Sequence, residues 1–141
     1  MRKLLLSLTL AFVMAFSCTT VGFAAVSEEA VVEPRATSSM NIYVSRESGT
    51  DGGATIDVNF ANYVDTFTIT VYLQKLSNGS WVNDTSNEDY IGRVTGSDRD
   101  YAFFDIFYDK LTRGTSYRLK VVSVTTYNRV TYKSTGYSQV F

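Results

Sequence analysis

The acidic side chains are the residues of this chain whose types and spacing are closest to those of a metal site or a pair of catalytic acids and bases. Asp84, Ser86, Glu88 and Asp89 place several oxygens in one short segment, and calcium accepts such ligands. The segment lacks the glycine and the terminal glutamate of the known calcium-loop pattern. We therefore interpret it as a solvated polar loop and predict no metal site.

Two further acidic pairs could suggest acid–base catalysis. Asp105 and Asp109 are four residues apart, with no other catalytic type close in sequence. Asp98 and Asp100 flank Arg99, where local pairing in a turn is the simpler interpretation. The chain has no His, which excludes Ser-His-Asp and Cys-His mechanisms and every His-ligated metal. The sequence predicts neither an enzyme nor a cofactor.

Charge and cysteine content exclude other classes of protein. The 141 residues carry 13 basic and 14 acidic side chains, whereas a nucleic-acid partner would require a concentrated basic surface. A single Cys excludes an intrachain disulfide framework. The stability of the fold must therefore come from its core.

The first 24 residues have the layout of a secretory signal peptide. Arg2 and Lys3 precede an apolar run from Leu4 to Phe16, which is too short to span a bilayer by itself. Cleavage after Ala24 would leave a mature chain with net charge −3 and no Cys. We expect a secreted protein and favour a bacterial source. The protein would contact a membrane only through this leader.

Cys18 provides the alternative to ordinary cleavage. The stretch Met14-Ala15-Phe16-Ser17-Cys18 loosely resembles a bacterial lipoprotein box. In that case Cys18 would be lipidated and would anchor the protein at the cell surface.

Residues 25–37 form a linker, and residues 38–141 form the predicted domain. The linker contains three glutamates and the only proline, Pro34, so we expect loose extension. The domain alternates with the period of strands. The expected strands cover residues 40–44, 54–60, 67–73, 81–82, 90–94, 101–108, 117–124 and 130–141.

Turn signals separate these strands. We expect turns or loops at residues 49–53, 61–65, 83–89 and 96–99, a tight hairpin at Asn78-Gly79, and a second one at Tyr127-Asn128-Arg129. Seven or so short strands without a helical period predict an all-β, antiparallel two-sheet sandwich. A small barrel is the competing architecture, because alternation does not decide closure.

The stretch Leu111-Thr112-Arg113-Gly114-Thr115-Ser116-Tyr117 and the alternating strand that follows it, to Val124, resemble the E–F corner of fibronectin type III domains. The resemblance implies an immunoglobulin-like sandwich and a structural corner. In that corner Leu111 closes the core, Gly114 allows the tight backbone, and the Tyr117 hydroxyl bonds a backbone group upstream. Arg113 replaces the family's usual proline, and Phe60 occupies the position of the family's core Trp. Another immunoglobulin-like sandwich is the alternative.

Large aromatic side chains are predicted on the outside of this domain. If Phe104, Ile106 and Tyr108 point into the core, Tyr101, Phe103, Asp105 and Phe107 point outward. The fibronectin-like layout implies that Tyr43 shares that face. An exposed aromatic patch indicates a contact surface or a covered one. The candidate binding residues are Tyr101, Phe103, Asp105, Phe107 and Tyr43.

These features together predict an exported, non-enzymatic binding module that acts at or outside the cell surface. Its partner would be an extracellular protein, a glycan or a second copy of itself. The alternatives are a carbohydrate-active accessory protein and a small carboxylate-dependent hydrolase.

Overall fold

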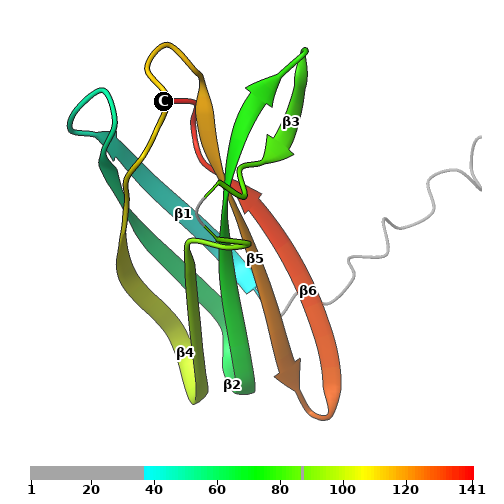
Figure 1. The fold of residues 1–141 in the computed structure, drawn as a ribbon. Helices are drawn as coiled ribbons and strands as arrows, with labels where there is room; N and C mark the ends of the chain where they lie inside the picture. Colours follow the sequence, from blue (N-terminus) through cyan, green and yellow to red (C-terminus); the bar gives the residue numbers. More distant parts are fainter. Residues whose placement is uncertain (1–36, 87) are drawn as a thin grey trace, which may run out of the picture. The chain divides into compact units, whose positions relative to one another are not determined.

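The computed structural model describes residues 37–86 and 88–141, and it contains strands without helices in that part of the chain (Figure 1). The leader, Cys18 and linker residues 25–36 lie outside the described residues. No described segment is a helix long and apolar enough to cross a membrane. The six strands are β1 (Thr37–Arg46), β2 (Gly52–Ser77), β3 (Ser80–Asn83), β4 (Gly92–Tyr108), β5 (Tyr117–Tyr127) and β6 (Val130–Tyr137).

The strands form one antiparallel sheet in which β2 is the central element. The first half of β2, residues 52–60, pairs with β1 on one side and with residues 101–108 of β4 on the other. The second half, residues 64–77, pairs with residues 92–99 of β4 and with β5, and its end pairs with β3. β6 extends the sheet beyond β5.

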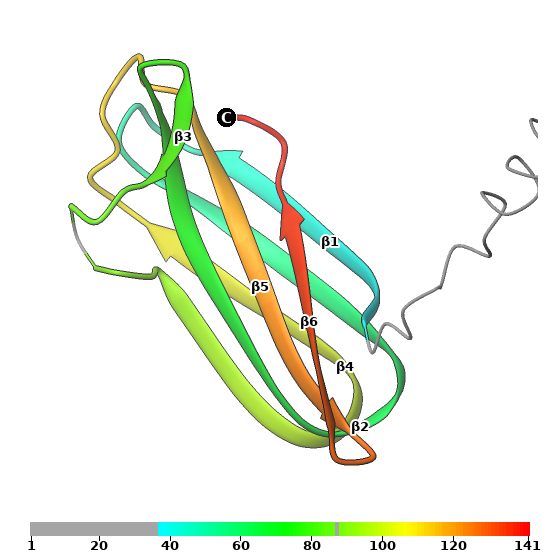
Figure 2. The ribbon, with the colours of Figure 1, turned by 90° about the vertical axis from the view of Figure 1, so that its right-hand side faces the viewer.

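This sheet curls into a partial barrel because β2 and β4 bend together (Figure 2). The curl brings the inner side chains of β1 close to β6. A Cβ built on Gly136 of β6 would lie 2.5 Å from the Met40 Sδ of β1. The expected all-β, antiparallel class is confirmed. The architecture is a curled half-barrel that lies between the expected open sandwich and the competing closed barrel.

Two predicted loops are parts of long strands. Residues 61–65 were expected to form a loop, but they lie inside β2 at the bend, where the pairing with β4 shifts register between Asn59 and Val64. Ala61, Asn62 and Tyr63 are exposed, while Val64 is buried and holds the bend on the core. A bulge of this kind lets a strand change direction without ending.

The second such segment, residues 96–99, was expected to form a turn and lies inside β4. The reason is packing rather than turn chemistry. A Cβ on Gly96 would lie 2.6 Å from the Phe67 ring, so the glycine makes room for that ring. Three further expected bounds were wrong, because β2 begins at Gly52, residues 90–94 do not form a separate strand, and the last strand ends at Tyr137.

The core is formed by the inner face of the curled sheet. Alternation places even-numbered residues inward before the bend of β2 and odd-numbered residues inward after it. At the bend, Phe60 and Phe67 pack with ring centroids 5.2 Å apart. The buried apolar residues are Ala54, Ile56, Val58, Phe60, Val64, Phe67, Ile69, Val71, Leu73, Ala102, Ile106, Tyr108, Leu111, Tyr117, Leu119 and Val121.

Both predicted tight hairpins are confirmed by their backbone angles. Asn78 and Gly79 have φ values of 50° and 77°, and Asn128 and Arg129 have values of 50° and 66°. Two successive positive φ values are the geometry of the two-residue turn whose twist matches the flanking strands.

Tyr108 ties the ends of β1, β2 and β4 together. Its buried hydroxyl lies 2.9 Å from the Ser45 carbonyl oxygen and 3.0 Å from the Gly53 carbonyl oxygen, and it donates to this pair. Burial raises the pKa of Tyr108 to about 12. The hydroxyl therefore stays neutral and remains a donor at neutral pH.

Candidate functional site

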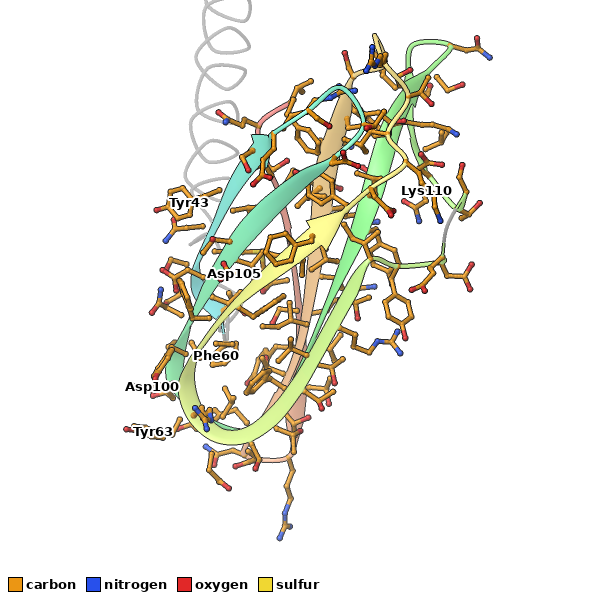
Figure 3. The ribbon with its side chains drawn as sticks, turned by 60° about the vertical axis from the view of Figure 1, so that its left-hand side comes forward. Tyr43, Phe60, Tyr63, Asp100, Asp105 and Lys110 are labelled. Atoms are coloured by element: carbon orange, nitrogen blue, oxygen red, sulfur yellow. The ribbon has the colours of Figure 1, made fainter. Side chains whose placement is uncertain are left out.

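The predicted aromatic surface is the outer face of β1, the first half of β2 and the second half of β4, which we call the aromatic face. Register places Tyr43, Thr55 and Asp105 opposite one another on the three strands. The neighbouring row holds Ser45, Gly53 and Phe107, and the next holds Asn41, Asp57 and Phe103. Figure 3 labels Tyr43 and Asp105 on this part of the molecule.

The orientation of β4 agrees with the sequence prediction. Ile106 and Tyr108 are buried and Phe104 is half-buried, whereas Asp105 is exposed. The exposed fractions of the outward rings are 51% for Tyr101, 62% for Phe103, 80% for Phe107 and 64% for Tyr43. No described segment of the chain covers these rings.

A shallow groove of about 390 Å³ lies in the aromatic face. Tyr43 on β1 and Phe107 on β4 line its two sides, and Gly53 and Thr55 of β2 lie between them. Glu47, Ser45 and Asp105 add polar groups to the lining. A Cβ on Gly53 would be 3.5 Å from Phe107 Cδ1, so the absence of a side chain at this position leaves the groove open.

The polar groups of the face are held by hydrogen bonds across the strands. Thr55 Oγ1 donates to Asp105 Oδ1 at 2.6 Å. This bond orients the carboxylate and engages one of its two oxygens. Asn59 Nδ2 donates to Asp57 Oδ1 and to Ser39 Oγ, at 3.2 Å in each case. The face therefore presents acceptors in fixed positions beside large rings.

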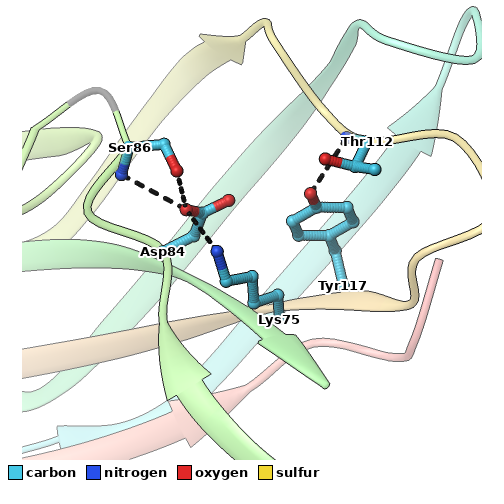
Figure 4. Close-up of polar contacts among 5 residues, drawn as sticks. All are labelled: Lys75, Asp84, Ser86, Thr112 and Tyr117. Atoms are coloured by element: carbon cyan, nitrogen blue, oxygen red, sulfur yellow. Dashed lines mark hydrogen bonds and ion pairs between the residues drawn. The ribbon is translucent and has the colours of Figure 1, made fainter. Parts of the chain in front are cut away.

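The structure places the other predicted site, the corner, at one end of the core. Leu111 is buried, and Gly114 has a φ of 75°, which favours glycine. The Tyr117 side chain is 1% exposed, and its hydroxyl oxygen accepts the backbone N–H of Thr112 at 3.0 Å (Figure 4). This contact five residues upstream is the one expected for a corner tyrosine.

Arg46 is a corner residue that sequence reasoning missed. Its guanidinium donates to the carbonyl oxygens of Gly49, Thr112 and Thr115 at 2.7, 3.0 and 3.1 Å, and it lies 5.7 Å from the Tyr117 ring centroid. A lone arginine at the end of a strand carries no signal for this role, because two of its three partners are 66 and 69 residues away.

In the loop that was considered for calcium, the first carboxylate, that of Asp84, has a structural role (Figure 4). Asp84 Oδ1 accepts Lys75 Nζ at 3.2 Å and both the backbone N–H and the hydroxyl of Ser86. Burial raises the pKa of Asp84, but the bonds from Ser86 and the charge of Lys75 outweigh it and hold the pKa below its usual value. No group of three or more metal-ligating side chains occurs within the described residues.

Asp105 and Asp109, the carboxylates considered for hydrolysis, are not brought into a facing pair by the fold. Asp105 lies on β4 and Asp109 directly follows the end of β4, and both side chains are exposed. Four extended residues span roughly 13 Å, beyond the 5–10 Å that separates two glycosidase carboxylates.

The groove floor is the part of the aromatic face that the sequence did not reveal. Gly53 was assigned to a turn, yet it is buried within β2 and paired on both sides. A glycine inside a strand can mark the close approach of a ligand, and its position between two strand-like runs was the available signal.

Comparisons with known proteins give distant resemblances to solved structures. The human F-spondin reeler domain (fragment 1) is 14% identical, with a TM-score of 0.37 over 79% of this chain and 99% of that chain. A protein from Archaeoglobus fulgidus is 10% identical, with a TM-score of 0.39 over 74% and 95% of the two chains. No family model matches the sequence, and no curated protein is similar to it.

Proposed function

We propose that this protein is an exported, non-enzymatic binding module that holds a glycan in the groove of its aromatic face. The observation that carries the proposal is the open floor at Gly53 between the rings of Tyr43 and Phe107, beside the oriented Asp105 carboxylate. Binding sites combine apolar and aromatic walls with a small number of placed polar groups.

A glycan suits this combination better than a flat protein surface. Sugar rings present C–H groups on their faces and hydroxyls at their edges, so they can stack on Phe107 and donate to a carboxylate together. Asp105 retains one oxygen beyond its bond from Thr55, and Asp57 continues the line of acceptors one row away. The outward positions of β1, of residues 52–60 and of residues 101–108 contain no Lys or Arg, which favours an uncharged sugar over an anionic one.

A fibronectin type III-like fold would provide the scaffold. Support comes from the strand pairing, in which β1, the first half of β2 and the second half of β4 form one layer, while β5, β6 and the second half of β2 belong to the other. The Tyr117 corner adds to this support. The continuous bends of β2 and β4 and the residue Arg113 depart from the family pattern.

The groove is tested by Gly53→Val. A branched side chain suits a strand, and the nearest atoms to the new Cβ are 3.4–3.6 Å away, so the fold should persist while the groove fills. We expect the glycan with the highest signal on an array to lose at least about tenfold in affinity by calorimetry, a loss of about 1.4 kcal/mol. Thr135→Val, an exposed position on β6, serves as the control and should bind like the parent. Unchanged affinity in Gly53→Val would contradict the groove.

Export is tested by the intact mass of the protein that cells release. We expect a mature chain that begins near Ala25, because the small residues Gly22 and Ala24 follow the apolar run in the layout of a signal cleavage site. A mass that retains a diacylated Cys18 would replace secretion with lipid anchoring.

A further inference from the structure

The outer face on the other side of the fold is formed by residues 92–99 of β4, the second half of β2, β5 and β6, and we call it the basic face. Register places Tyr72, Lys120 and Tyr137 in one row, and Thr68, Val124 and Lys133 in another. Arg93 and Arg118 occupy further outward positions. Away from the bend, the outward positions of these described segments hold four cations and no Asp or Glu, whereas the exposed Asp65, Asp98 and Arg99 lie at the bend.

The arginines of this face are supported by rings and an amide rather than by a carboxylate. The Arg118 guanidinium lies 4.5 Å from the Trp81 ring centroid and 4.3 Å from that of Tyr137, and its Nε donates to Gln74 Oε1 at 2.9 Å. Arg93 lies 4.2 Å from the Tyr90 ring centroid. These contacts fix the cations without neutralising them.

The aromatic face has the opposite charge. Its outward positions include Asp57 and Asp105, with Glu47 at the groove, and they contain no Lys or Arg. Its exposed rings also provide π faces that suit Arg and Lys. One molecule therefore carries two outer sheet faces of complementary charge, and its own fold keeps them apart.

We propose that the partner of the basic face is the aromatic face of a second copy of this chain. The two faces are different, so the contact is head-to-tail, and each added copy leaves one face of each kind free for the next. Twisted sheets stack face to face at about 30°, which allows the rings of one copy to meet the cations of the other. The proposal is independent of glycan binding, although a glycan in the groove would compete with the second copy.

Charge reversal on each face provides the test. One variant carries Asp57→Lys and Asp105→Lys, so both of its faces are basic. The other carries Lys120→Glu and Lys133→Glu, so its basic face, which keeps Arg93 and Arg118, no longer has a net positive charge. In sedimentation velocity at about 0.01 M salt, where screening begins only beyond about 30 Å, the parent should self-associate. Each variant alone should associate at least about tenfold more weakly, because the charge complementarity between its two faces is lost.

An equimolar mixture of the two variants should regain association, because the unaltered basic face of the first variant then meets the unaltered aromatic face of the second. Lys110→Glu with Arg113→Glu makes the same change in net charge in the loop after β4, and it should associate like the parent. The proposal fails if the parent stays a single chain at about 0.01 M salt. It also fails if the loop control weakens association equally or if the mixture stays dissociated. Dextran sulfate serves as a polyanion probe. If it binds the basic face of a chain that does not self-associate, the partner of that face is a polyanion and the proposal fails.

Discussion

The double substitution Phe103→Ser, Phe107→Ser is expected to remove glycan binding while leaving the melting temperature near that of the parent. The two rings are 62% and 80% exposed, so their removal opens no cavity in the core. A large aromatic contributes roughly 1.5–3 kcal/mol when a partner buries it fully. Phe107 lines the groove and Phe103 lies two rows along the same face, and the loss of both rings should lower affinity by about a hundredfold or more.

Calorimetry of the array-selected glycan measures this loss, and thermal unfolding monitors the fold. Tyr63→Ser combined with Val130→Ser is the matched control, because these side chains are 68% and 49% exposed and neither lines the groove. The control should bind like the parent. Collapse of the double-serine variant would show that the rings are structural, and full binding in a folded variant would remove the site.

The outward direction of these rings could be predicted because register allows little choice on this strand. A slip of one residue would bury Asp105 and expose Ile106, and an unpaired buried carboxylate is costly. Local turn residues predicted both hairpins. Asn78-Gly79, for example, matches the backbone that the tight turn requires.

The bends of β2 and β4 could not be predicted by the same means. A short exposed stretch such as Ala61-Asn62-Tyr63 has the same sequence pattern in a loop and in a bulged strand. What decides between them is a distant partner, here Arg99 opposite Val64. Gly96 was misjudged for the same reason, because its role depends on the Phe67 ring.

The candidate site was predicted from the sequence only in part. The rings lie on single strands and follow from alternation, whereas the groove requires that Tyr43, Gly53 and Phe107 meet across three strands. Sequence reasoning placed Tyr43 on this face through the family resemblance, but it had no means to identify the floor. Arg46 was missed because two of its three carbonyl partners, Thr112 and Thr115, are set by the tertiary fold.

Tyr117→Phe is expected to lower the free energy of unfolding by about 1–3 kcal/mol, the cost of leaving a buried polar group without its partner. The Tyr117 side chain is 1% exposed, and its oxygen is the acceptor for the Thr112 N–H. Phenylalanine keeps the ring, its contact with Phe141 and the approach of Arg46. The substitution therefore isolates the hydroxyl.

Denaturant titration measures this difference, and the slope m should stay unchanged because the area exposed on unfolding is the same. Tyr63→Phe is the matched control, since that side chain is 68% exposed at the bend of β2, and it should leave stability within about 0.5 kcal/mol. A neutral Tyr117→Phe would mean that the Thr112 N–H is satisfied by solvent. The corner would then contribute nothing specific, and the main support for a fibronectin type III-like fold would be gone, while the groove and both outer faces would stand unaffected.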